Sequence, residues 1–254
     1  MKLGNLFAFI VVFFCLGGGL LAQENEKKDN RIIIPAVHFD VGYNWVSGDR
    51  GEAVNSGLVA GGGFLLKDRK NFMYDLEFSY AFSDKVKNYL TVFPNLITKN
   101  GLILDNSGAN AAIDVSMRSY SFMFKVGKIL IPMKKNKECG FFLNLGAGYM
   151  ESFFRIKGEE DAVPQLRNDY AKVYDQLRGG FVTSQSIGYV NFGDDNLRNF
   201  IVEFEVKENF SKSLRKYDMV LQKKDTKSYT DIYMGIKLKW MFPFKKKVKD
   251  YYYH

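Results

Sequence analysis

Strict alternation of side-chain type over residues 72–82 constrains the fold of this chain more than any other feature. The odd positions of this segment include Asp75, Glu77 and Ser79, whereas every even position is aromatic or leucine. The even positions are Phe72, Tyr74, Leu76, Phe78, Tyr80 and Phe82. Because successive side chains of a β-strand point to opposite faces, the segment predicts a strand with one apolar and one polar face.

The same alternation recurs along the chain and predicts eight strands. They cover residues 36–45, 56–67, 72–82, 115–131, 140–156, 180–192, 200–207 and 232–242. Strands that are apolar outside and polar inside are what a barrel needs when its solvent is lipid. We therefore predict an all-β fold, an eight-stranded antiparallel up-and-down transmembrane β-barrel with long extracellular loops. A soluble β-sandwich or lipocalin-like barrel is the alternative, and in a soluble barrel the aromatic face would point inward.

The predicted connections alternate in length. Residues 68–71, 133–138 and 193–198 are short connections, residues 83–114, 158–179 and 209–227 are long ones, and residues 47–55 are intermediate. Short turns at one rim and long loops at the other are typical of outer-membrane barrels, with the short turns and both termini in the periplasm. Apolar pieces of the 83–114 connection leave open an additional hairpin, which would give ten strands.

The first 22 residues predict a cleavable signal peptide. Lys2 supplies the positive start, residues 6–21 the apolar stretch, and the cut is expected after Ala22. A retained membrane helix is one alternative. A lipoprotein using Cys15 is another, although Phe14 is bulky for the position before a lipidated cysteine. Residues 23–31 would then form a periplasmic linker, 32–244 the barrel in the bacterial outer membrane, and 245–254 a basic and aromatic periplasmic tail.

Composition excludes several classes of protein. After the predicted cut the chain has a single cysteine, Cys139, so an intrachain disulfide is not expected. No segment after the cut approaches the roughly 18–20 consecutive apolar residues of a membrane helix, so a bilayer would have to be crossed by a closed sheet. The net charge of +8 is spread over the loops and the tail, and nucleic acid is not an expected partner of an exported barrel.

Besides the strand pattern, three stretches of sequence indicate a resemblance to known proteins. They are LLAQ at the predicted cut, AVPQLRNDYAKVYDQLRGG at 162–180, and GIKLKWMFPF at 235–244. Together with the pattern, they make the chain resemble the small outer-membrane barrels of the OmpA and OmpX type, and more closely the barrel proteins of Bacteroidota. Such barrels usually end on an aromatic residue of the last strand. Here that residue would be Phe242 or Phe244, and a tail continues beyond it.

The two predicted faces differ in chemistry. The inward face carries a predicted ionic network of Asp40, Asp75, Glu77, Lys125, Glu203, Glu205, Lys207, Lys237 and Lys239. The lipid-facing set includes Phe78, Tyr80, Phe122, Phe124, Phe204 and Trp240. Buried charges persist only when they are paired, so we expect the network to close the narrow bore of an eight-stranded barrel. An ion path, and hence a narrow channel, is the alternative.

Catalysis is not expected, although lipid A deacylases and acyltransferases are enzymes of this scaffold. Both classes need a histidine beside a serine nucleophile or an acid. His254 ends the polar tail, and His38 is predicted to point into the barrel near Asp40 and close to the periplasmic end. The glycines at 61–63 lie within a strand and lack the helix of a phosphate loop. No metal-ligand spacing is present and no cofactor is expected, while an outer-membrane lipid-modifying enzyme remains an alternative.

Function is therefore expected at the rims. In the 158–179 loop, Leu166, Tyr170, Val173 and Leu177 recur at helical spacing between Pro164 and Gly179. In the tail, Lys245, Lys246 and Lys247 precede Tyr251 and Tyr252. Both segments are candidates for partner binding. The alternative is that the loop is a lid on its own barrel and that the tail is solvated. We predict a structural or interaction element that contacts outer-membrane lipid and other outer-membrane or periplasmic proteins, as an accessory subunit of an assembly or secretion complex.

Overall fold

The computed structural model describes residues 32–84, 86–87, 92, 95, 97–98, 100, 103–111, 113–133, 136–158, 163, 174–193, 199–218 and 221–244. The predicted signal peptide, the linker and the basic tail lie outside the described residues. Within the described part, no helix is long and apolar enough to cross a membrane.

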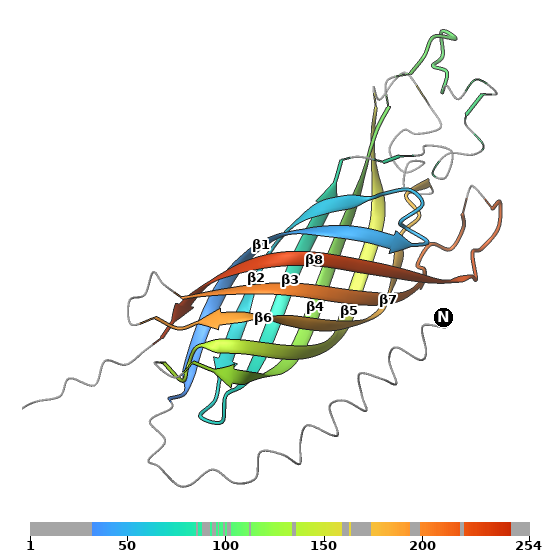
Figure 1. Ribbon diagram of the computed structural model, residues 1–254. Coiled ribbons are helices and arrows are strands. Elements are labelled where there is room, and N and C mark those ends of the chain that lie inside the picture. Colours follow the sequence, from blue (N-terminus) through green and yellow to red (C-terminus); the bar gives the residue numbers. More distant parts are fainter. Residues whose placement is uncertain are drawn as a thin grey trace, which may run out of the picture. The chain divides into compact units, whose positions relative to one another are not determined.

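Eight antiparallel strands close into one barrel (Figure 1). The strands are β1 (Ile34–Gly48), β2 (Ser56–Lys67), β3 (Phe72–Ser83), β4 (Ile113–Pro132), β5 (Gly140–Gly158), β6 (Arg178–Asn191), β7 (Phe200–Ser213) and β8 (Ser228–Pro243). Each strand pairs with the next along the chain, and β8 closes the barrel on β1 with Trp240 opposite Phe39. The predicted eight-stranded up-and-down fold is confirmed. Between Ser83 and Ile113 the described residues form only isolated bridges, which gives no support to a ten-stranded barrel.

Two predicted boundaries were wrong, and both lie on the long-loop side of the last hairpin. Strand β7 continues to Ser213, so the connection begins later than the predicted 209, whereas its end before Ser228 matches the predicted 227 and β8 starts earlier than the predicted 232. Asn209 and Ser211 are fully buried inside the barrel, and Phe210 between them is 47% exposed. The alternation therefore continues past residue 207 with small polar side chains on the inner face, where charged ones stand earlier in the strand.

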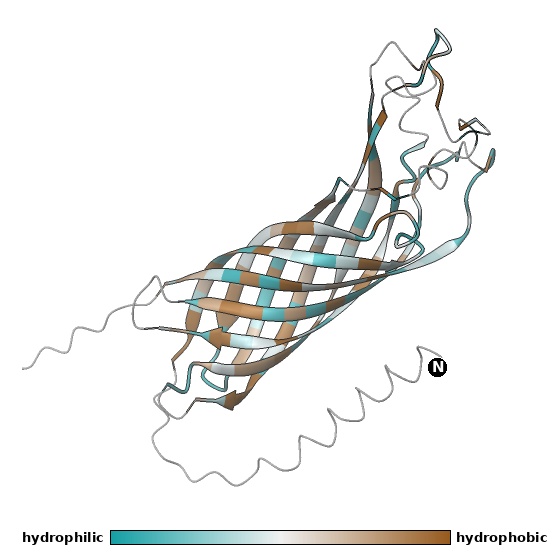
Figure 2. Ribbon diagram, turned by 45° about the horizontal axis from the view of Figure 1, so that its top comes forward, coloured by the Kyte–Doolittle hydropathy of each residue, from teal (hydrophilic) through white to brown (hydrophobic). Residues whose placement is uncertain are grey.

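Apolar side chains cover the outside of the barrel, as their exposure shows. Figure 2 shows hydrophobic and hydrophilic residues following one another along the strands. Exposed fractions are 52% for Phe78, 56% for Phe122, 42% for Phe204 and 45% for Trp240. These four rings come from β3, β4, β7 and β8, so the apolar surface follows the sheet around the barrel. A soluble barrel would bury them, so the predicted polarity of the sheet is the one observed. Phe124 is also exposed, and Tyr80 is half-buried.

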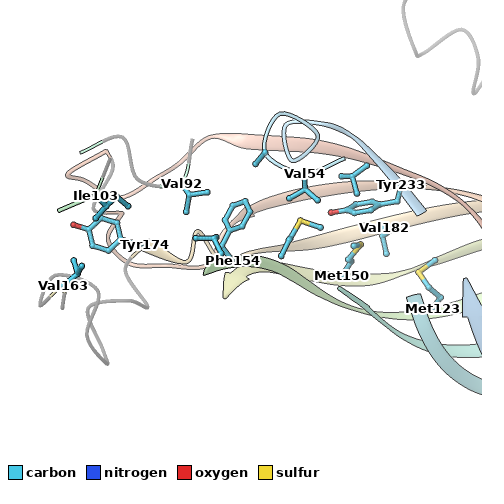
Figure 3. Packing of buried hydrophobic residues seen from close by; sticks show 14 residues of the cluster. Val54, Val92, Ile103, Met123, Met150, Phe154, Val163, Tyr174, Val182 and Tyr233 are labelled. Carbon is cyan, nitrogen blue, oxygen red and sulfur yellow. The ribbon is translucent and has the colours of Figure 1, made fainter. Parts of the chain in front are cut away.

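Apolar clusters fill both ends of the interior. At the short-turn end, eleven buried residues pack together, among them Leu65, Phe142 and Met241. At the long-loop end, a second cluster extends from Met123 inside the barrel to Tyr174 beyond the strands (Figure 3). Other buried side chains, such as Lys67 at the short-turn end and Arg50 at the long-loop end, are charged.

Candidate functional site

The nine charged residues predicted for the lumen all lie inside the barrel. Each is at most 7% exposed. They come from β1, β3, β4, β7 and β8, so side chains from opposite walls meet across the bore. Because the lumen of an eight-stranded barrel is only wide enough for its own side chains, these groups reach one another directly.

Glu77 is the centre of this ionic layer. Its carboxylate oxygens lie 2.7 Å from Lys125 Nζ and 2.6 Å from Lys239 Nζ. Lys237 Nζ is 2.5 Å away, and the Ser79 hydroxyl donates a hydrogen bond of 2.8 Å. Glu77 and Lys125 are fully buried, so their ion pair is far less screened by water than a surface pair is.

Two further carboxylates share the same lysines. Glu205 lies 2.6 Å from Lys125 Nζ and 2.7 Å from Lys237 Nζ. Glu203 lies 3.2 Å from Lys239 Nζ, across one step of the β7–β8 ladder. Glu203 is opposite Lys237, but Glu205 is opposite Gly235, so it reaches Lys237 diagonally.

His38 and Asp40 form the edge of the layer. His38 Nε2 is 2.9 Å from Asp75 Oδ1, and Nδ1 is 3.5 Å from Asp40 Oδ1. Asp75 also accepts from Lys239 at 2.8 Å, which connects the histidine to the lysine network. Asp40 was predicted to join that network, but within the described residues its charged neighbour is His38. The predicted neighbourhood of His38 and Asp40 is observed, while the contact with Asp75 was missed.

Glycines of β2 make the contact between β1 and β3 possible. A Cβ on Gly63 would lie 2.7 Å from His38 Nε2 and would also collide with the backbone oxygen of Leu76. A Cβ on Gly61 would lie 2.7 Å from Asp40 Oδ2. Side chains of β1 therefore pass over β2 to reach Asp75 on β3. The glycine run at 61–63 serves close packing in the lumen.

His38 is 1% exposed, so its ring is sealed from both rims of the barrel. No group of three His, Cys, Asp or Glu side chains among the described residues is arranged to hold a metal ion. What the arrangement does chemically is to fill the bore with mutually neutralising charges.

A second polar cluster lies at the long-loop end, where the β1–β2 connection turns into the barrel mouth. The Arg50 carbonyl accepts the N–H groups of Ala53 and Val54, both at 3.0 Å, and this tight turn directs the Arg50 side chain inward. Its guanidinium donates to the carbonyl oxygens of Ser152 at 3.1 Å and Gln176 at 2.5 Å. Burial, followed by repulsion from Arg178, lowers the pKa of Arg50 to about 10.

A cavity of about 210 Å³ lies above Arg50. It is lined by Asp49, Arg50, Glu52, Ala53, Phe154, Gln176, Arg178, Asp218, Leu221, Lys227 and Tyr229. The Arg50 guanidinium lies 4.6 Å from the centre of the Phe154 ring, which also belongs to the apolar cluster of Figure 3. Sequence reasoning did not find this cavity, because its residues come from three connections and from strand ends where the alternation carries no information.

The candidate partner-binding segments are only partly covered. Leu166, Tyr170, Val173 and the tail residues Lys245, Lys246, Lys247, Tyr251 and Tyr252 lie outside the described residues. Leu177 lies in no regular element, and its N–H donates to Asp175 Oδ1 at 3.0 Å. Strand β6 begins at Arg178, so the helix predicted to run to Gly179 is wrong at that end. Asp175 is held in turn by Arg215, whose pKa is raised by that hydrogen bond.

Comparison with known proteins gives structural likenesses only. No family model matches the chain, and no curated protein matches it. The chain is similar to Ail, the attachment invasion locus protein of Yersinia pestis, at 7% identity and a TM-score of 0.42, covering 83% of this chain and 99% of that one. Neisserial surface protein A is similar at 8% identity and a TM-score of 0.37, covering 82% of this chain and 97% of that one. The outer membrane protease OmpT of Escherichia coli is similar at 10% identity and a TM-score of 0.26, covering 87% of this chain and 99% of that one. Since these TM-scores are below 0.5, the fold assignment rests on the strands and their pairing.

Proposed function

We propose that this chain is an exported outer-membrane barrel with a plugged lumen that acts as a structural or protein-interaction element. In this proposal it is an accessory subunit of a larger outer-membrane assembly or secretion complex. The assembly role rests on the resemblance to Bacteroidota barrels and not on any motif of the chain. Its partners would be outer-membrane lipid and other outer-membrane or periplasmic proteins.

The observation that carries the proposal is the closure of the bore. An apolar layer at the short-turn end, the ionic layer around Glu77 and an apolar layer at the long-loop end follow one another along the axis. In this proposal a barrel filled in this way offers no continuous aqueous path, and its exterior and its rims are the surfaces left for function. The exposed rings of Phe122 and Trp240 fit a hydrocarbon environment for the exterior.

The alternatives fit these observations less well. A lipid-modifying enzyme needs its histidine at the outer leaflet, whereas His38 is sealed in the interior beside Asp75. A narrow channel needs an open line of polar groups, whereas the apolar side chains of Met123, opposite Glu77, and of Phe142 are fully buried inside the barrel.

Affinity purification of the tagged full chain from native membranes tests the interaction role. We expect a defined set of outer-membrane or periplasmic proteins to remain bound in mild detergent at moderate salt. Recovery of the barrel alone, under conditions that keep a known complex of the same membrane intact, would contradict the accessory-subunit role.

Planar-bilayer recording tests the plugged lumen separately. The purified barrel is expected to give no ion conductance beyond that of the protein-free bilayer. Reproducible single-channel steps would favour the narrow channel. Lipid analysis of cells that lack the chain covers the third class, since a lost or gained acyl chain on lipid A would favour the enzyme.

A further inference from the structure

The cavity above Arg50, here called the mouth cavity, is lined by two cationic side chains that contact the same aromatic ring. The Arg178 guanidinium lies 3.4 Å from the centre of the Tyr229 ring, and Lys227 Nζ lies 4.9 Å from it. Tyr229 is itself fixed, because its hydroxyl donates to Asp225 Oδ2 at 2.7 Å. Asp225 also accepts the Lys227 N–H at 2.9 Å. The two cationic groups are thereby positioned beside the cavity before any ligand arrives.

Positive charge in this region is not fully matched by hydrogen-bond acceptors. Arg178 Nη1 is buried and has no acceptor within the described part of the chain. Its other terminal nitrogen, Nη2, has only a long contact of 3.4 Å to Gln176 Oε1. Below it, Arg50 is 1% exposed, and its guanidinium donates to hydroxyl, amide and carbonyl oxygens. A buried donor without an acceptor is costly, so this arrangement favours a ligand that supplies negatively charged oxygens.

The acidic residues of the lining are less available than the basic ones. Asp49 Oδ2 accepts the Thr230 N–H at 2.9 Å, and Asp49 Oδ1 is 3.5 Å from Lys227 Nζ. Asp218 Oδ1 accepts the Leu221 N–H at 3.1 Å. Glu52 is exposed and can turn to solvent. A cation entering the cavity would therefore meet occupied carboxylates and two guanidinium groups, whereas an anion would meet Arg178 and would compete with Asp49 for Lys227.

From this geometry we infer that the mouth cavity binds the phosphate or sulfate ester of a sugar, with its oxygens between Arg178 and Lys227. The cavity of about 210 Å³ compares with roughly 30 Å³ for one water molecule in the liquid. It therefore has room for a tetrahedral oxyanion and part of a sugar ring. The ester could belong to a soluble carbohydrate or to the headgroup of a glycolipid in the same leaflet. This inference does not depend on the proposed assembly role.

Exposed lysines around the cavity would draw such a ligand toward it. Lys212, Lys216, Lys223 and Lys224 of the β7–β8 connection and its flanking strand end are all exposed. Asp225 in the same connection is buried against Tyr229 and offsets one of these four charges. Because these charges act through solvent, their contribution is expected to fall as salt is added.

Calorimetric titration of the full chain in phosphatidylcholine nanodiscs, with glucose 6-phosphate as the probe, tests the inference. Arg178→Gln should weaken binding about tenfold or more, since it removes charge-assisted hydrogen bonds. Lys227→Gln should weaken binding several-fold. Lys212→Gln is the matched control, because it removes one positive charge from the same hairpin outside the cavity lining, and it should change affinity by less than about twofold.

Two results would overturn the inference. One is binding of glucose 6-phosphate no tighter than that of glucose. The other is an equal loss of affinity in Lys212→Gln and Lys227→Gln, which would show general surface attraction. If Arg178→Gln does not fold, as judged by gel migration before and after heating, the exposed Lys227 decides the matter alone. Repeating the titration in nanodiscs that contain lipid A separates the two sources. If the site takes a glycolipid headgroup, lipid A competes and the apparent affinity for glucose 6-phosphate falls. If the site takes a soluble ester, that affinity is unchanged.

Discussion

Replacing Glu77 with alanine should destabilise the barrel by about 3–5 kcal/mol, the range for removing one partner of a buried ion pair. The carboxylate lies within 2.7 Å of three ammonium groups, and its residue is fully buried. The cavity beside Glu205, Lys207 and Lys237 is only about 20 Å³, so the lysines lose a charge partner and gain little hydration in return.

The loss stays near that of one pair because each lysine keeps a second carboxylate. Lys125 and Lys237 retain Glu205 at 2.6 and 2.7 Å, and Lys239 retains Asp75 at 2.8 Å. Three independent buried pairs would together exceed this range. The shared carboxylates therefore set an upper limit on the loss of unfolding free energy.

Urea unfolding of the barrel in lipid vesicles, followed by tryptophan fluorescence, measures the change. Asp84→Asn is the control, because it breaks the pair between Arg118 and a carboxylate that is 65% exposed, with a donor–acceptor distance of 3.0 Å. That surface pair is expected to contribute less than about 1 kcal/mol. If Glu77→Ala changed the free energy of unfolding as little as Asp84→Asn does, the lumen would be hydrated, and the closed bore would have to be abandoned.

Three further predictions address the exterior, the histidine and the glycines. Phe204→Arg places a charge on the lipid face at the depth of the ionic layer and should cost roughly 2–4 kcal/mol in the same urea assay, whereas a change below 1 kcal/mol would speak against a hydrocarbon exterior. His38→Ala should destabilise the barrel by about 1–3 kcal/mol, since it leaves a buried Asp75 oxygen without its donor. Mass spectrometry should find the lipid A of the same cells unchanged, and an altered acylation pattern would support a lipid-modifying enzyme. Gly63→Val should slow or prevent folding, seen as loss of the heat-modifiable gel band, because its side chain would collide with His38; a normal band would mean that β2 can move outward.

The strands were predictable because each position has only two possible faces. Polar residues at every second position identify the inner face, and this is why the 72–82 strand was found within a residue of its ends. The rule was applied too narrowly to β7, where Asn209 and Ser211 continue the inner face as uncharged residues. A small polar side chain inside a narrow lumen signals the same orientation as a carboxylate does.

The site was less predictable than the sheet because its contacts are tertiary. Alternation assigns Asp75 and His38 to the lumen, but nothing local states that the glycine at 63 lets one reach the other across β2. Arg50 was missed for a related reason. Its inward direction follows from a turn in which its own carbonyl accepts two N–H groups, and a turn of this kind has no periodic signature. Only the meeting of three connections turns Arg50, Arg178 and Lys227 into one lining.

The ionic layer and the aromatic exterior together hold the sheet in one register. If β8 slipped by one residue against its neighbours, Trp240 would enter the lumen and Lys237 and Lys239 would face the hydrocarbon. Each lysine would then cost roughly 2–4 kcal/mol at the centre of a bilayer, and Glu77 and Glu203 would be left buried without these partners. An interior filled with apolar side chains could be just as stable, yet its strands would be apolar on both faces and a slipped register would carry little penalty. The buried charges of this barrel therefore specify which face points inward, and closure of the bore follows from that same arrangement.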